Sequence, residues 1–174
     1  MSYTLIQTVT LTSNQASISF NSIPATFDDL VVVHDLRTNT GGEEGTGIRF
    51  NGSTSGYSMR TLSGDGSAVG SETAPYGVTN FGFAGFVWSS AGNTSVSIYI
   101  PNYISSVAKS YSVDAVTEIN QTRSIQALVA GLHTGTSAIS SLSITAYNSK
   151  TFVTGGMASL YGVKRGSSGG VVVS

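Results

Sequence analysis

The feature that most constrains this chain is a series of short runs in which apolar and polar residues alternate. Residues 94–100 are the clearest example, because Val96, Ile98 and Ile100 fall on one face and Pro101 then ends the run. No segment repeats its apolar residues at the helical period of about 3.6 over three turns. The pattern therefore predicts half-buried β-strands joined by turns.

About ten β-prone runs follow one another at regular spacing; several alternate, whereas residues 30–36 are almost continuously apolar and residues 124–132 form a long apolar run. They cover residues 3–11, 15–20, 30–36, 48–50, 57–62, 94–100, 109–117, 124–132, 141–147 and 151–164. The first two runs are expected to form a hairpin, and Asn51-Gly52 supplies the turn of a second pair. The sequence predicts an all-β fold, an antiparallel two-sheet β-sandwich that is most simply jelly-roll-like. A helix over residues 124–133 is the weakest alternative.

Composition agrees with one strand-rich domain. The chain has 174 residues, of which 10% are charged and 21 are glycine, against about 25% charged residues in a typical domain. Residues 38–46 and 63–76 are polar and unpatterned, so we expect exposed loops there. Residues 1–164 are expected to form the β-sandwich domain. Residues 165–174 are expected to form a flexible Gly/Ser linker with a short apolar tail.

Charge and cysteine content exclude several classes of function. The formal net charge is −1 without a basic block, which disfavours nucleic acid as a partner. The absence of cysteine excludes disulfides and thiolate metal sites. The sequence shows neither a signal peptide nor an apolar stretch of about 18 residues that could span a membrane. We expect synthesis in the cytoplasm and no membrane partner.

Candidate catalytic groups are sparse. The two histidines, His34 and His133, have no acidic or thiol neighbour at ligand spacing. The acid pairs at 28–29 and 43–44 cannot act as two-carboxylate sites if they lie on strands, since adjacent strand residues point to opposite faces. We predict no enzymatic activity, no catalytic residue, no cofactor and no metal ligand, although calcium bound by loop carboxylates stays open.

Two apolar segments are candidate partner interfaces. Between residues 78 and 88, the aromatic residues Phe81, Phe83, Phe86 and Trp88 are interleaved with glycine, which favours packing in the core or between subunits over a sugar-binding platform. The end of the chain holds a second candidate, a β-prone tail that could add a strand to a neighbouring subunit. Its residues are Val171, Val172 and Val173.

Several strand and turn segments resemble a family of tailed-phage structural proteins that is frequent in cyanophages and other aquatic phages. The segments are residues 20–30, 49–52, 57–62, 100–103 and 158–164. The resemblance implies a β-sandwich virion component that decorates the capsid or belongs to tail and fibre parts. It brings no active site with it.

Two functions follow from this resemblance. In the first, the chain is a capsid decoration or cement protein that binds the major capsid protein or other virion proteins as a homo-oligomer, with a trimer favoured. In the second, it is a tail- or fibre-associated module whose loops recognise a host glycan. The chain shows neither shaft repeats nor coiled-coil heptads, which favours the first function and a location in the virion.

Overall fold

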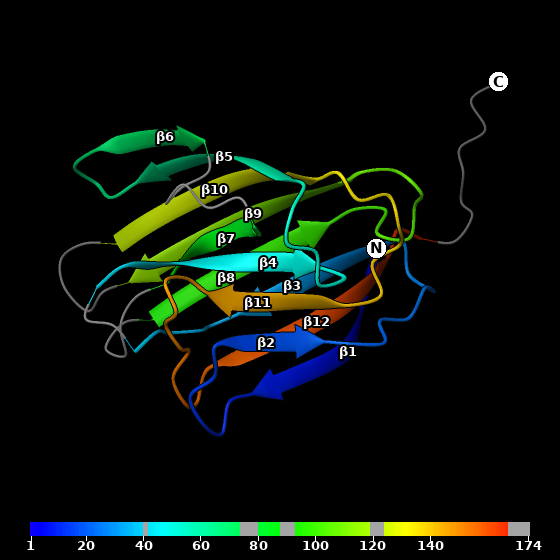
Figure 1. The fold of residues 1–174 in the computed structure, drawn as a ribbon, viewed down its shortest axis with the longest axis horizontal. Helices are drawn as coiled ribbons and strands as arrows, with labels where there is room; N and C mark the ends of the chain where they lie inside the picture. Colours follow the sequence, from blue (N-terminus) through cyan, green and yellow to red (C-terminus); the bar gives the residue numbers. More distant parts are fainter. Residues whose placement is uncertain (40–41, 74–79, 88–92, 119–123, 167–174) are drawn as a thin grey trace.

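The computed structural model describes residues 1–39, 42–73, 80–87, 93–118 and 124–166. These residues contain twelve β-strands and no helix, and the strands form two antiparallel sheets that lie face to face (Figure 1). The strands are β1 (Ser2–Thr10), β2 (Ser17–Phe20), β3 (Asp29–His34), β4 (Glu44–Phe50), β5 (Tyr57–Gly64), β6 (Val69–Thr73), β7 (Gly82–Val87), β8 (Asn93–Ile100), β9 (Lys109–Glu118), β10 (Ser124–His133), β11 (Leu142–Ala146) and β12 (Met157–Lys164). The predicted all-β fold with two antiparallel sheets is confirmed, and the jelly-roll order of strands stays a prediction.

The two sheets differ in size. The larger sheet has eight strands in the order β1-β12-β3-β8-β9-β10-β5-β6, and the smaller has four in the order β2-β11-β4-β7. The terminal strand β12 lies between β1 and β3, and β3 lies between β12 and β8. The last strand of the chain therefore joins the first strand to the rest of the larger sheet.

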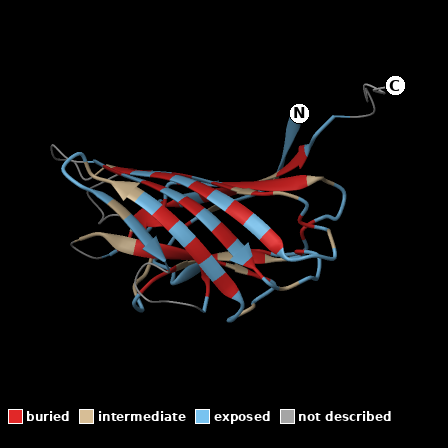
Figure 2. Cartoon of the chain, turned by 90° about the horizontal axis from the view of Figure 1, so that it is seen from above, coloured by how far each residue is buried: buried red, intermediate tan, exposed pale blue. Residues whose placement is uncertain are grey.

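Alternation along the strands separates an inner from an outer face of the larger sheet. In β9 the inward residues Tyr111, Val113 and Ala115 are buried, whereas Ser112 and Asp114 between them are exposed. The same alternation holds along β10. Figure 2 shows it as bands of buried and exposed residues along these strands. The strands that the sequence predicts at 94–100, 109–117 and 124–132 are confirmed as β8, β9 and β10, and the one predicted as a long apolar strand, 124–132, is half-buried like the other two.

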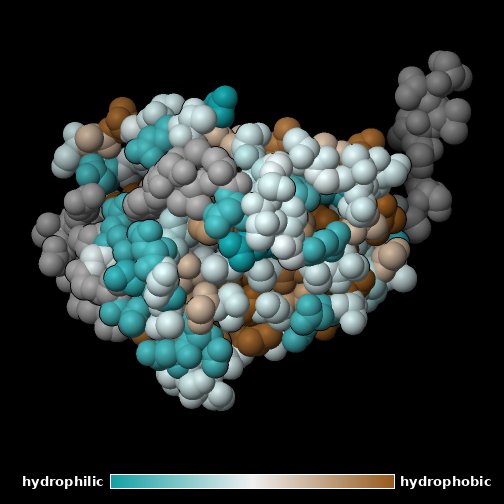
Figure 3. Space-filling model, viewed as in Figure 1, coloured by the Kyte–Doolittle hydropathy of each residue, from teal (hydrophilic) through white to brown (hydrophobic). Residues whose placement is uncertain are grey.

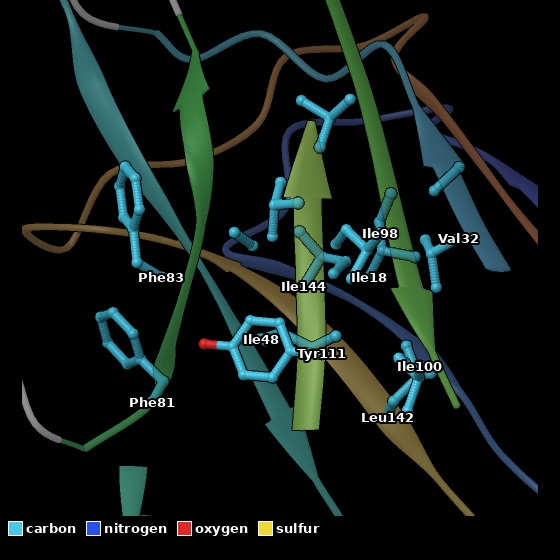
Figure 4. Close-up of a cluster of buried hydrophobic side chains, with 14 of the residues drawn as sticks. Ile18, Val32, Ile48, Phe81, Phe83, Ile98, Ile100, Tyr111, Leu142 and Ile144 are labelled. Carbon is cyan, nitrogen blue, oxygen red and sulfur yellow. The ribbon is translucent and has the colours of Figure 1, made fainter. Parts of the chain in front are cut away.

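The core fills the space between the two sheets. Ile18, Ile48 and Ile144 project from the smaller sheet, and Val32 and Ile98 project from the larger one; all five are at most 2% exposed. Figure 4 shows these side chains beside the ring of Tyr111, with Phe81 and Phe83 on the other side of β7. Packing of this kind supplies most of the free energy that stabilises the fold.

The hairpin predicted for the first two strands is wrong. β1 pairs with β12 in the larger sheet, whereas β2 pairs with β11 in the smaller sheet. The chain between them crosses from one layer to the other. Leu11 is buried there and exchanges backbone hydrogen bonds with Gly155 and Gly156, and Gln15 does so with Phe152. Backbone partners far along the chain, which the local pattern does not reveal, hold this corner.

The second predicted strand pair is wrong in its pairing and right in its turn. Asn51 and Gly52 have φ angles of 51° and 69°, as a tight reversal requires. The amide of Ser53 donates a hydrogen bond of 2.9 Å to the carbonyl of Phe50. The strands on either side then separate, because β4 pairs with β7 and β11 while β5 pairs with β6 and β10. The turn thus connects the two sheets.

Two strands lie where the sequence pattern shows none. β6 forms inside the segment that we expected to be an exposed loop and pairs with β5. β7 is buried on both faces, so its side chains show no alternation. The loop predicted for residues 38–46 is also shorter than expected, because Thr38 and Thr46 are fully buried and β4 starts at Glu44.

Candidate protein-binding face

The outer face of the larger sheet carries apolar side chains among small polar ones. One row of directly opposed residues crosses all eight strands of this sheet. Its members are Thr8, Ser159, Val33, Ser97, Asp114, Leu128, Leu62 and Ser71. Val33 is 43% exposed, Leu128 47% and Leu62 59%. Leu62 and Leu128 lie directly opposite each other on neighbouring strands, so they form a continuous exposed apolar area.

A hollow of about 400 Å³ adjoins these two leucines. Its floor holds small residues, Ser112 and Ala130, and larger side chains of Arg60, Tyr99 and Leu128 surround them. The complete lining is Arg60, Leu62, Ser97, Tyr99, Ser112, Val113, Asp114, Leu128, Val129 and Ala130. A second hollow of about 550 Å³ shares both leucines and continues toward β6. We call this region, centred on Leu62 and Leu128, the sheet face.

Charge on the sheet face is sparse and mixed. Arg60 and Asp114 are both exposed and line the same hollow, which gives it one positive and one negative group. The remaining polar groups there are mainly serine hydroxyls, which can donate or accept hydrogen bonds. The opposite side of the molecule, seen in Figure 3 over β4 and β11, shows its apolar residues as small areas among polar ones.

A buried carboxylate lies at the end of β3, on the same larger sheet. Asp29 is 0% exposed and accepts hydrogen bonds from the Tyr99 hydroxyl (2.8 Å), the Asn102 amide (2.9 Å) and Nε of Arg165 (2.7 Å). A second guanidinium nitrogen of Arg165 completes the ion pair. Burial alone would raise the pKa of Asp29, but the hydrogen bonds from Arg165, Asn102 and Tyr99 outweigh it and lower that pKa.

The Asp29 cluster fixes the end of β12. Arg165 follows β12 directly, and its own amide donates a hydrogen bond of 2.8 Å to Oδ2 of Asp28. Because both oxygens of Asp29 are occupied by protein donors, the cluster is already satisfied and is best understood as a structural anchor. The sequence predicts that Arg165 belongs to the flexible linker, whereas its side chain is bound to Asp29 of the domain.

The two histidines lie on separate strands and play no common role. His34 is buried in β3, and burial lowers its pKa to about 3. His133 ends β10 and stacks on the ring of Tyr57 with centroids 4.5 Å apart. Within the described ranges, no group of three His, Asp or Glu side chains is placed to hold a metal ion. A search of the same residues finds no helix that could span a membrane.

The candidate interface residues of the aromatic segment lie inside the core. Phe81, Phe83 and Phe86 are 6%, 0% and 8% exposed, and the rings of the first two lie 4.3 Å and 6.1 Å from the ring of Tyr147, on the side of β7 that faces away from Tyr111 in Figure 4. Of the readings that the sequence left open, core packing is the one observed, which leaves these rings little surface for a partner. Trp88 lies outside the described residues, as do Val171, Val172 and Val173.

Sequence reasoning missed the sheet face, although a signal for it is present. In β5 the inward positions are Tyr57, Met59 and Thr61, so Leu62 falls at a position that should be polar. Leu128 is out of phase in the same way in β10. An apolar residue at an outward position of an alternating strand is the pattern that identifies such a face. Comparison with protein-family models, curated proteins and solved structures finds no match to this chain.

Proposed function

We propose that this protein is a structural component of a tailed-phage virion, a decoration protein that binds the outside of the capsid through its sheet face. The observation that carries the proposal is the pair of directly opposed, exposed leucines Leu62 and Leu128 on the outer face of the larger sheet, with exposed Val33 in the same row. The resemblance of the strand and turn segments to virion proteins suggests which partner binds this face, namely the major capsid protein or another virion protein.

The dimensions of the sheet face suit a protein partner. Eight strands spaced by about 4.8 Å give a width of roughly 34 Å, and strands of about eight residues give a length of roughly 26 Å. Their product, roughly 900 Å², is close to the area of about 800 Å² that one partner contributes to a standard interface. Exposed leucines surrounded by serine hydroxyls also match the mixed character of interfaces between separately folded proteins.

Shell binding can be tested with recombinant protein and capsids of the encoding phage that lack it. We expect the protein to cosediment with these capsids and Leu62→Lys/Leu128→Lys to abolish cosedimentation, because two buried charges would be left without partners. Val107→Lys is the matched control, since Val107 is 60% exposed but lies in the β8–β9 connection. Its binding should equal that of the unmodified protein.

Labelled antibodies in electron microscopy of intact particles give a second, independent readout. Decoration predicts label over the capsid surface, whereas label confined to the tail would overturn the proposal. Binding to a host glycan that the double lysine variant abolishes, without any binding to capsids, would instead establish the receptor-binding alternative.

A further inference from the structure

One margin of the larger sheet is an open edge. β12 is the only strand paired with β1 in the part of the chain that the structure describes. Every second amide and carbonyl of β1 therefore points away from the sheet, along the margin drawn in dark blue in Figure 1. Such a row of backbone groups is a template for a further strand.

β1 lacks the short length, the charged side chains and the proline that often protect an open edge. Natural edge strands are short or carry charged residues or proline, whereas β1 is nine residues long with the sequence SYTLIQTVT. The first acidic or basic side chain of the whole chain is Asp28. β6, at the opposite margin of the same sheet, has five residues and includes Glu72. Of the two edge strands of this sheet, β1 is therefore the better suited to pair with a strand of another molecule.

Two large side chains of β1 are exposed beside this edge. Tyr3 is 59% exposed and Leu5 is 54% exposed. They lie on the same face of the strand, since they are two residues apart and oppose Val163 and Tyr161 in an unbroken register. The register with β12 shifts between Leu5 and Gln7, so the regular part of the edge ends at Leu5.

We propose that β1 pairs with β1 of a second copy of this chain, antiparallel and about a two-fold axis at Thr4. In this register Tyr3 of each copy lies opposite Leu5 of the other, and directly opposed side chains are about 4.5–5.5 Å apart at Cβ. The pairing covers both exposed side chains at once. It also joins the larger sheets of the two copies into one continuous sheet.

The absence of charge favours a second copy over an unrelated strand. Two-fold pairing sets each residue of a segment against a residue of the same segment, so a charged side chain near the axis would meet a like charge. The edge from Ser2 to Thr10 has none. A two-fold contact closes at a dimer, so the trimer favoured from the sequence would need another surface. The pairing does not depend on the shell binding proposed above.

Cysteine cross-linking tests the register, because the chain has no cysteine of its own. Thr4→Cys would oppose itself across the axis, where Cα atoms about 4.5–5.5 Å apart are within disulfide range. We expect the full chain with Thr4→Cys to form covalent dimers under mild oxidation. Thr10→Cys, exposed on the same strand beyond the bulge, is the matched control and should stay monomeric on a non-reducing gel. Equal cross-linking of both variants, or none with Thr4→Cys, would overturn the proposal.

Charge substitution tests the opposed pair in solution. Tyr3→Lys/Leu5→Lys sets lysine against lysine in both symmetric pairs and should weaken the dimer by at least about tenfold. Tyr3→Lys/Leu5→Glu sets opposite charges against each other and should restore it. Leu62→Lys, on β5 at the other side of the sheet, should leave the dimer unchanged. Sedimentation measures the association, and unchanged thermal unfolding confirms that each variant is folded.

A chain that sediments as a monomer at its highest soluble concentration would overturn the pairing. A trimer whose association is unchanged in both Tyr3→Lys/Leu5→Lys and Tyr3→Lys/Leu5→Glu would also overturn the pairing. Loss of capsid binding by Leu62→Lys/Leu128→Lys with an intact dimer would separate the sheet face from the β1 edge. The proposal for the sheet face and the proposal for the β1 edge can therefore be refuted independently.

Discussion

His34 shows how burial determines the charge of one residue. Its Nδ1 accepts a weak hydrogen bond of 3.5 Å from the Leu36 amide, and its Nε2 has no partner among the described residues. Because burial lowers its pKa to about 3, the imidazole stays neutral in the folded protein. The unfolded chain takes up a proton near pH 6.5. Acid below this pH therefore favours unfolding.

We expect the free energy of unfolding to fall by about 2 kcal/mol between pH 6.5 and pH 5 through His34 alone. His34→Gln should remove most of this dependence, since glutamine does not titrate. Urea unfolding at a series of pH values measures it. His34→Gln/His133→Gln is the reference and should be almost independent of pH in that range, because these are the only two histidines. Parallel pH curves for the unmodified chain and His34→Gln would contradict the expectation.

Gly131 on β10 makes room for the ring of Tyr111. A Cβ at Gly131 would lie 2.0 Å from Cζ of Tyr111, and one at Gly82 of β7 would lie 2.1 Å from its hydroxyl oxygen. Both contacts are far inside van der Waals distance. The ring therefore occupies space that these two strands leave open only because both positions are glycine.

Gly131→Ala should lower the free energy of unfolding by at least about 2 kcal/mol, because the ring must leave its place in a close-packed core. Gly64→Ala on β5 is the control, since its Cβ would meet its nearest neighbours at 3.8 Å. Chemical denaturation compares the two variants. Equal stability of both would show that the core adapts without cost.

Asp29 illustrates what local sequence cannot reveal. Beside Asp28 it reads as half of an acid pair that cannot form a two-carboxylate site, and Arg165 reads as part of a linker. The register that sets Asp29 opposite Val163 brings Asp29 and Arg165 within hydrogen-bond distance of each other. That register depends on the pairing of strands far apart in the chain, so the cluster was not predictable from spacing or residue type.

At the level of elements, strands that follow one another in both sequence and sheet were predictable. β8, β9 and β10 are neighbours in both, and their alternation gives position and orientation. β7 was not predicted as a strand, because a strand that is buried on both faces shows no alternation of apolar and polar residues. Asn51-Gly52 shows a further limit, since turn residues specify a reversal without specifying which sheet receives the next strand.

The end of β12 allows a prediction about the tail. Truncation after Gly166 keeps the Asp29–Arg165 ion pair and should leave the free energy of unfolding almost unchanged. Truncation after Lys164 also removes Arg165, which leaves a buried carboxylate short of two donors, and should cost about 1–3 kcal/mol. Thermal and urea unfolding separate the two lengths.

Truncation after Gly166 also tests docking of the tail. If Val171, Val172 and Val173 add a strand to a neighbouring subunit or to the shell, loss of the residues after Gly166 should weaken assembly while the domain stays folded. Sedimentation and capsid binding of the chain that ends at Gly166 measure this. Assembly identical to that of the full chain would show that the tail makes no contact.

At the scale of the molecule, the two ends of the described domain are neighbours. Ser2 lies opposite Lys164 in the β1–β12 pair. A circular permutant that joins Gly166 to Met1 through a short Gly/Ser linker, with new ends between Gly66 and Ser67, should therefore fold. The new ends fall in the exposed β5–β6 turn, where few contacts are lost.

Circular dichroism and urea unfolding should give nearly the same spectrum and midpoint for this permutant as for the chain ending at Gly166. Opening the chain between Ile48 and Arg49 is the control. Because Ile48 is fully buried in an interior strand of the smaller sheet, that permutant should not fold. A folded control would mean that β4 is less important to the sandwich than its place suggests.

The position of β12 also constrains how the protein is made. β12 lies between β1 and β3, and residues 157–164 are synthesised after every other strand. While they are still being added by the ribosome, β1 cannot join the larger sheet and one side of β3 stays unpaired. The nascent chain thus carries unpaired strand edges on β1 and β3 until β12 has left the ribosome, so the larger sheet is completed only then and chaperones that shield such edges should raise the yield.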